Sequence, residues 1–262
     1  MADATIVLIT GANTGIGYQV VRTLYSADKP YTVIAAARSI SKAQDAIDEI
    51  QKEFPASSNT LAPIVIDVES DESIQKAFEQ VQAKYGRVDA LVNNAGAQFD
   101  STALSTREAW NKSWDVNVTG THILTDTFVP LLLKSSSPRI LFVTSGTSTL
   151  AGSESRSLPV DQSPAAGWPK TGLSVPAYRS AKTGLNMMMR EWERLLKNDG
   201  VKVFAISPGM LATGLMRIDV ETMKRMGAGD ASVAGPLFRD IIEGERDGDA
   251  GKVVNKDGVQ PW

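Results

Sequence analysis

Short apolar segments rich in β-branched residues alternate with helical segments along this 262-residue chain. Apolar runs of this kind are typical of strands that are buried on both faces of a parallel sheet. We expect strands at residues 5–10, 31–37, 61–66, 88–92, 139–144, 201–207 and 251–254. We expect helices at residues 18–26, 40–54, 71–85, 106–111, 114–134, 176–198, 210–226 and 231–244. Because neither a repeat nor a linker interrupts the alternation, the sequence predicts a single α/β domain over residues 1–262, with a doubly wound parallel sheet flanked by helices.

The first predicted strand runs directly into a glycine-rich turn. Gly11, Gly15 and Gly17 have the spacing G-x-x-x-G-x-G, and a predicted helix begins at Tyr18. Glycines let the backbone approach a pyrophosphate closely, and the start of the helix offers free N–H groups and the positive end of its dipole. A plain tight turn is the alternative. The strand and helix on either side favour a Rossmann-like dinucleotide site.

The second predicted strand ends at Arg38. In Rossmann units an acidic residue near this position holds the ribose 2'-hydroxyl of NAD, whereas an arginine accommodates the 2'-phosphate of NADP. Residues 35–41 contain neither Asp nor Glu. Arg38 could simply be a solvated residue at a strand end, but its position favours NADP(H) over NAD(H).

Tyr178 and Lys182 are four residues apart in a predicted helix. Side chains at this spacing share one face of the helix. A tyrosine with its ordinary pKa of about 10 is a poor proton donor or base at neutral pH. We expect a cation beside it to lower that pKa towards the working range. The pair alone is weak evidence, because the same spacing is common by chance.

Small and polar residues follow two other predicted strands. The run Asn-Asn-Ala-Gly at residues 93–96 follows one of them, and Ser145 follows another. In a doubly wound sheet the carboxyl ends of the strands border the ligand crevice, so both positions are candidate site residues. Asn117 lies inside a predicted helix, where Asn is mildly unfavourable; solvent exposure or capping is the alternative to a functional role.

Composition excludes several classes of function. A net charge of -3 gives no electrostatic reason to expect a nucleic acid or an anionic membrane as a partner. Without cysteine the chain has no thiolate chemistry, and its one histidine, His122, cannot form a multi-histidine site. A carboxylate site is the remaining alternative, and we expect no metal. His122 falls in an apolar helical run, and we expect it to pack in the core. Since we find no signal peptide and no apolar run long enough for a bilayer, the default expectation is a soluble, cytoplasmic protein.

Together and in this order, the motifs resemble those of the short-chain dehydrogenase/reductase family, in its shorter branch. The matching residues are Thr10-Gly11-x-x-x-Gly15-Ile16-Gly17, Asn93-Asn94-Ala95-Gly96, Asn117, Ser145, Tyr178-x-x-x-Lys182, and Pro208-Gly209 with Thr213. The resemblance extends from Thr5 to about Val254. With Arg38, the chain looks most like the NADP-dependent carbonyl reductases of that family.

The resemblance implies a role for each residue. Tyr178 would be the general acid in carbonyl reduction and the base in the reverse direction, and Lys182 would lower its pKa and bind the nicotinamide ribose. Ser145 would polarise the substrate oxygen, and Asn117 would position a water that relays protons through Lys182. The cofactor would be contacted by Gly11, Asn13, Thr14, Ile16, Gly17, Arg38, Asp67, Val68, Asn94, Ala95, Gly96, Tyr178, Lys182, Pro208, Gly209 and Thr213.

The glycine turn departs from the family pattern at Asn13 and Thr14, where many NADP-preferring members carry a basic residue. The preference for NADP therefore depends on Arg38 and on the missing acid.

The loop between Ser145 and Tyr178 is a second departure, because it carries an insertion of roughly twenty residues. In carbonyl reductases a similar, larger insertion covers the helix face that is used for oligomerisation. We expect residues 152–174 to pack near the Tyr178 helix, to shape the substrate site, and to favour a monomer or dimer over a tetramer.

These patterns favour an NADPH-dependent enzyme that reversibly reduces a ketone or aldehyde, with a small carbonyl compound or alcohol as its partner. An NAD-linked alcohol dehydrogenase of the same fold and a non-catalytic NADP-binding sensor or scaffold are the alternatives. A sensor would be expected to lack part of the catalytic set. Candidate residues of the substrate pocket, some of which could equally be core, are Gln98, Phe99, Trp168, Met210, Leu211, Leu215 and Met216.

Overall fold

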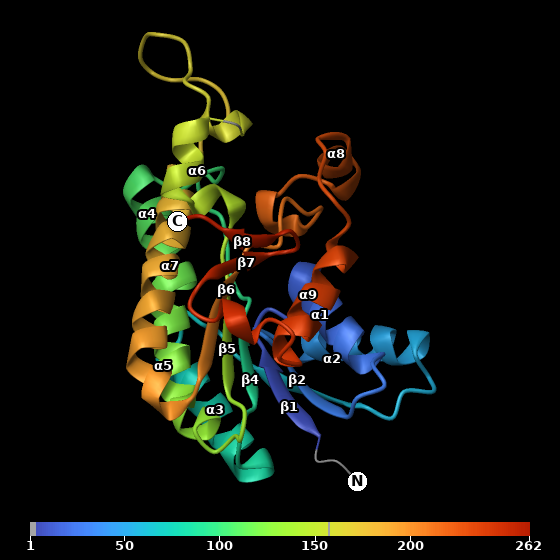
Figure 1. The fold of residues 1–262 in the computed structure, drawn as a ribbon. Helices are drawn as coiled ribbons and strands as arrows, with labels where there is room; N and C mark the ends of the chain where they lie inside the picture. The colour runs from blue at the N-terminus through green and yellow to red at the C-terminus, as the bar shows by residue number, and fades with distance from the viewer. Residues whose placement is uncertain (1–3, 157) are drawn as a thin grey trace.

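An eight-stranded sheet forms the centre of the protein in the computed structural model, which describes residues 4–156 and 158–262 (Figure 1). The strands are β1 (Thr5–Ile9), β2 (Tyr31–Ala37), β3 (Thr60–Val65), β4 (Ala90–Asn93), β5 (Arg139–Val143), β6 (Lys202–Ile206), β7 (Val253–Asn255) and β8 (Gly258–Gln260). Their order is β3-β2-β1-β4-β5-β6-β7-β8. Every neighbouring pair is parallel except β7 and β8.

Helices cover both faces of this sheet. The helices are α1 (Gly15–Tyr25), α2 (Ile40–Glu53), α3 (Asp71–Tyr85), α4 (Thr106–Trp114), α5 (Gly120–Leu132), α6 (Leu150–Ser155), α7 (Pro176–Leu196), α8 (Val220–Arg225) and α9 (Ala234–Ile242). Figure 1 shows α1, α2 and α9 on one face and α3, α4, α5 and α7 on the other. Because side chains alternate along a strand, Ile6 and Leu8 of β1 enter one core and Val7 and Ile9 enter the other. The predicted α/β fold with a doubly wound sheet is confirmed.

The strand order reverses between β1 and β4, which makes this part of the sheet a topological switch point. The chain moves outward from β1 to β3 and then returns to β4, on the other side of β1. Ligands of doubly wound folds bind at the carboxyl ends of the strands where the order reverses in this way. The turn after β1 and the segments after β4 and β5 all meet there.

The structure corrects the helices that were predicted at residues 106–111 and 114–134. The two form one continuous helical path, in which α4 passes through a π-helical turn at Asp115–Thr119 into α5. Asn117 lies in this π-helical turn. Such turns are rare and often occur at functional sites.

The helix predicted at residues 210–226 is wrong. Only a 3-10 turn at Gly214–Met216 and the short α8 are helical there. The N–H of Ala212 donates to the carbonyl oxygen of Gly229, and the N–H of Gly229 donates to that of Met210. The segment thus folds back on itself and bonds across the bend instead of along a helix axis.

Two elements and one side chain were not anticipated. Strand β8 closes an antiparallel hairpin with β7, and α6 lies inside the long loop at residues 146–175. His122 is exposed and lies beside the ring of Trp192, with 5.3 Å between the ring centroids, so its predicted core packing is wrong.

No helix within residues 4–156 and 158–262 has the length and apolar character needed to cross a membrane.

Candidate active site

The glycine-rich turn joins β1 to α1, as predicted. Gly11 and Gly15 have φ angles of +62° and +58°, a backbone region that favours glycine. A Cβ atom on Gly17 would lie 2.4 Å from the carbonyl oxygen of Gly11 and 2.5 Å from Nδ2 of Asn94. Thr14 precedes α1 without a side-chain cap. The first N–H groups of α1 therefore have no side-chain cap, and the glycines of the turn carry no side chains that would cover them. Such a helix start can bind a pyrophosphate.

Thr10 and Asn94 fasten the end of β1 to the end of β4. The Thr10 hydroxyl accepts the N–H groups of Asn94 and Ala95, both at 3.0 Å. The Asn94 side chain donates to the carbonyl oxygens of Thr10 at 2.7 Å and Gly11 at 3.1 Å. These bonds hold two predicted cofactor segments side by side at the switch point.

Asn117 is fully buried and holds the segment after β4. Its Nδ2 donates to the carbonyl oxygens of Ala97 and Ser113, both at 2.8 Å, and its Oδ1 accepts the N–H of Ala97 at 3.2 Å. A Cβ on Gly96 would lie 2.9 Å from Asn117 Oδ1 and 3.3 Å from Lys182 Nζ. Glycine at position 96 thus lets its backbone approach the side chains of Asn117 and Lys182 closely.

Tyr178 and Lys182 lie on the buried side of α7, 8% and 4% exposed. The Lys182 ammonium donates to the carbonyl oxygen of Val143 at 2.8 Å and lies 5.8 Å from the centroid of the Tyr178 ring. Ser145 follows β5, and its hydroxyl lies near enough to the phenol of Tyr178 to lower the pKa of that phenol. The structure therefore brings Asn117, Ser145, Tyr178 and Lys182 together at the carboxyl edge of the sheet.

The structure does not show the predicted lowering of the Tyr178 pKa by Lys182. Burial raises the pKa of Tyr178 to about 12, although the Ser145 hydroxyl lowers it. Burial also lowers the pKa of Lys182 to about 7. Because the lysine itself loses much of its charge near neutral pH, it stabilises a phenolate less than an exposed cation at the same place would.

Asp100 was not singled out from the sequence. Its carboxylate accepts the N–H of Ala177 at 2.8 Å and that of Tyr178 at 3.1 Å. Val175, the residue that precedes α7, makes no side-chain cap of its own, and Pro176 has no N–H to donate. The cap comes from the β4–α4 loop, 77 residues away from Ala177, so no local pattern predicts it.

The other predicted cofactor residues lie around the same crevice or near it. Thr213 lies against the glycine turn, with its Cβ 3.5 Å from the place of a Cβ on Gly15. Asp67 and Val68 follow β3, and Val68 is buried. Arg38 is exposed at the end of β2 and forms no hydrogen bond or ion pair with the described residues. Pro208 and Gly209 follow β6; Pro208 is half-buried, and Gly209 is exposed with a φ angle of +90°. In the glycine turn, Asn13 is half-buried and Ile16 packs against the core.

The residues suggested for an apolar pocket are dispersed. Trp168 is 87% exposed and Met210 is 52% exposed, whereas Leu211 belongs to the core beneath α1 and α9. Gln98 is buried, with its Oε1 unpaired among the described residues. The described residues contain no cluster of His, Asp and Glu that could hold a metal ion.

Comparison with known proteins identifies the family. The model of the short chain dehydrogenase family matches residues 5–157 and 163–224, and the chain belongs to this family of oxidoreductases. A short-chain dehydrogenase/reductase of a Phoma species, eupG, is 47% identical over 98% of this chain and 97% of its own length. One from Talaromyces stipitatus, tropE, is 43% identical over 100% and 99%.

Solved structures share the fold. An NADPH-bound carbonyl reductase from chicken fatty liver has a TM-score of 0.79 and 22% identity, over 99% of both chains. The RhlG/NADP active-site complex of Pseudomonas aeruginosa has a TM-score of 0.79 and 20% identity, over 98% of this chain and 96% of that one.

Proposed function

We propose that this protein is an NADPH-dependent reductase that converts a ketone or aldehyde to an alcohol, reversibly. The observation that carries the proposal is the grouping of a buried phenol, a hydroxyl and a buried lysine beside a glycine turn. The Ser145 hydroxyl lies near Tyr178 and lowers the pKa of its phenol, and Lys182 follows one helical turn after Tyr178. Membership of the short chain dehydrogenase family gives the general oxidoreductase role.

The residues of the crevice fit a dinucleotide. A Cβ on Gly17 would collide with the carbonyl oxygen of Gly11 and with Nδ2 of Asn94, so glycine lets the start of α1 pack against the turn, and α1 begins without a side-chain cap. Arg38 is exposed directly after β2, residues 35–41 contain neither Asp nor Glu, and an arginine at this position of a Rossmann unit would contact a 2'-phosphate. The NADP complex of RhlG and the NADPH-bound carbonyl reductase described above support the same choice. NADPH, when bound, would supply the hydride.

Tyr178 supplies the proton in this proposal. Its pKa is raised to about 12, so the phenol carries its proton at neutral pH but is a weak acid. Donation becomes favourable as the hydride reaches the carbonyl carbon, because the alkoxide that develops on the substrate oxygen is a stronger base than the phenolate of Tyr178. Ser145 donates a hydrogen bond to the same oxygen and so stabilises the charge that develops on it. Lys182, with a pKa of about 7, can release or accept a proton near neutral pH. In this proposal Lys182 would return a proton to Tyr178 and would regain one through a water positioned by Asn117.

The test is consumption of NADPH, followed by absorbance, with a panel of aldehydes, ketones and diketones, and with NADH in parallel. We expect turnover that prefers NADPH, and Arg38→Asp should shift the preference towards NADH. Preference for NADH in the unaltered protein would favour an NAD-linked alcohol dehydrogenase instead. Tight binding of NADPH without turnover of any carbonyl compound would favour a sensor.

A further inference from the structure

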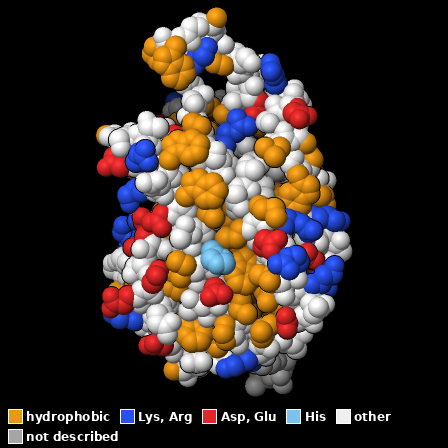
Figure 2. Space-filling model, turned by 90° about the vertical axis from the view of Figure 1, so that its left-hand side faces the viewer, with side chains coloured by type: hydrophobic (Ala, Val, Ile, Leu, Met, Phe, Trp, Pro, Cys, Tyr) orange, Lys and Arg blue, Asp and Glu red, His pale blue; other side chains and the backbone are white. Residues whose placement is uncertain are grey.

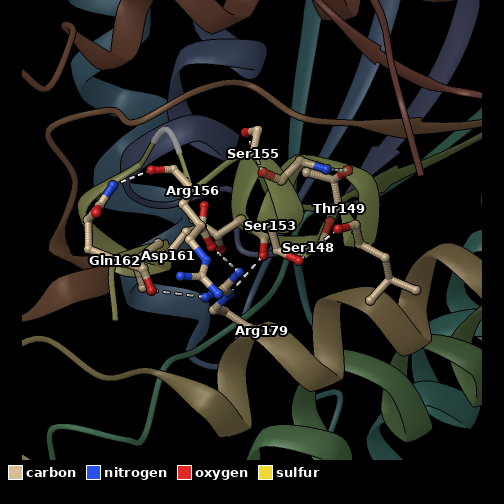
Figure 3. Close-up of polar contacts among 12 residues, drawn as sticks. Ser148, Thr149, Ser153, Ser155, Arg156, Asp161, Gln162 and Arg179 are labelled. Atoms are coloured by element: carbon tan, nitrogen blue, oxygen red, sulfur yellow. Dashed lines mark hydrogen bonds and ion pairs between the residues drawn. The ribbon is translucent and has the colours of Figure 1, made fainter. Parts of the chain in front are cut away.

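Arg179, the residue after Tyr178, joins α7 to the inserted loop (Figure 3). Its Nη2 forms an ion pair with Oδ1 of Asp161 at 2.5 Å, and its Nη1 donates to the carbonyl oxygen of Val160 at 3.2 Å. The Asp161 side chain is only 3% exposed and that of Arg179 is 23% exposed. Removing one member of such a pair leaves the other charge poorly solvated, which is strongly unfavourable.

The same guanidinium also reaches the loop that carries Ser145. Arg179 Nε donates to the carbonyl oxygen of Thr147 at 2.9 Å. Thr147 in turn contacts Ser145 twice, because its N–H donates to Ser145 Oγ at 3.2 Å and the two hydroxyls share a hydrogen bond of 3.0 Å. Arg179 thus connects Asp161 with the residue that holds the Ser145 hydroxyl.

The Thr147 N–H has a chemical consequence for Ser145. A hydroxyl has one proton to donate and two lone pairs that accept. Because the backbone N–H of Thr147 occupies one lone pair of Ser145 Oγ, it limits the directions in which the hydroxyl can point. A shift of the Thr147 peptide would turn the hydroxyl away from Tyr178.

We propose that Arg179 and Asp161 are a positioning pair, which fixes the Ser145 hydroxyl through Thr147 and couples its orientation to the position of the insertion. Asp161 lies in the break at residues 158–162 of the family match, so the pair couples an inserted residue to the common site. The catalytic consequence rests on the proposed function. Neither residue touches the reacting atoms.

A double-mutant cycle tests the pair. Asp161→Asn and Arg179→Met should each lower kcat/KM for carbonyl reduction about tenfold, and the double variant should lose about the same tenfold, because both break one linkage. We expect kcat to fall and the KM for the carbonyl compound to rise, while the Kd for NADPH changes less than about twofold. Independent losses that multiply to about a hundredfold, or an equal loss of NADPH affinity, would overturn the proposal.

The control is the exposed pair Lys76 and Glu72 on α3, where side chains are 65% and 78% exposed. Lys76→Met and Glu72→Gln should leave all these constants unchanged, since exposed pairs contribute little. Arg179→Lys keeps the charge without the forked geometry and should restore part of the activity that Arg179→Met loses.

Hydrogen exchange tests the linkage without any substrate. In Asp161→Asn the backbone amides of residues 146–148 should exchange faster, whereas those of β1 and α3 should not change. Unchanged exchange at residues 146–148 would refute the linkage even if activity fell. Absence of NADPH turnover in the unaltered protein would refute the proposed function. The exchange measurement would still test whether Arg179 and Asp161 hold residues 146–148 in place.

Discussion

Lys182 is buried, at 4% exposed, and among the described residues its ammonium group donates one hydrogen bond, to the carbonyl oxygen of Val143. Burial without a carboxylate partner disfavours the ammonium form, which is why the pKa of Lys182 falls to about 7. The fold tolerates this cost at a residue that a merely structural core would fill with an apolar side chain. Such perturbed groups cluster at functional sites.

The pH dependence of stability should carry the signature of Lys182. Its folded pKa of about 7 lies below the ordinary value of 10.5. Between these values the unfolded chain binds the extra proton, so the free energy of unfolding rises with pH in this window. Lys182→Met removes this titration. Thermal unfolding followed by circular dichroism should show the Tm of the unaltered protein rising, relative to that of Lys182→Met, between pH 7 and pH 9. A difference that does not vary with pH would contradict the account.

At the scale of the element, α7 is a 21-residue helix whose first turn carries Tyr178 and is held from outside the helix. Asp100 accepts two of its first N–H groups, and Arg179 ties the same turn to Thr147. A negative charge at a helix start is stabilising, because it meets the positive end of the helix dipole. The placement of the phenol therefore depends on the β4–α4 loop.

Loss of the Asp100 cap should reduce activity more than its effect on stability would suggest. Asp100→Ala removes both acceptors, which should cost about 1 kcal/mol of stability and lower kcat several-fold through a displaced Tyr178. Asp100→Asn keeps one acceptor oxygen and should fall between. The control is Asp230→Ala, which removes an aspartate cap from Ser232 before α9, on the opposite face of the sheet. Equal kcat losses in Asp100→Ala and Asp230→Ala would argue against a specific role for Asp100.

At the scale of the whole molecule, the sequence predicted what depends on local pattern. Buried strands and the glycine turn follow from short-range composition, and parallel strands necessarily bring Ser145 and Asn94 to one edge of the sheet. Contacts that depend on distant partners were missed. The Asp100 cap spans 77 residues, and the segment after Met210 bonds to Gly229 instead of forming a helix. His122 has apolar neighbours in sequence but lies on the outer side of α5.

The outer face formed by α4, α5 and α7 has an apolar groove of about 440 Å³. Figure 2 shows hydrophobic side chains gathered on this face around the single histidine. The groove is lined by Trp114, His122, Gly184, Met187, Met188, Glu191, Trp192 and Leu195. None of these residues comes from the insertion, which instead contacts the first turn of α7 through Arg179. The described residues of the insertion, 152–156 and 158–174, therefore do not line this groove.

The monomer or dimer expected from the sequence stays a prediction. If the protein is a dimer, we expect the two copies to bury this groove, because exposed apolar patches of this kind mark interaction surfaces. Met187, which is 60% exposed, is the residue to change. Light scattering should find no tetramer, and Met187→Glu should convert any dimer to monomer. A tetramer in the unaltered protein would contradict the prediction.

The central claim is that Tyr178 donates the proton in a reaction for which the rest of the crevice binds NADPH. The most direct measurement compares the unaltered protein with Tyr178→Phe, using NADPH fluorescence for binding and absorbance for oxidation with one reactive carbonyl compound. We expect both proteins to bind NADPH with similar Kd and only the unaltered protein to oxidise it, with a loss in the variant of about a hundredfold or more. Equal rates of oxidation in the two proteins would contradict the assignment of Tyr178.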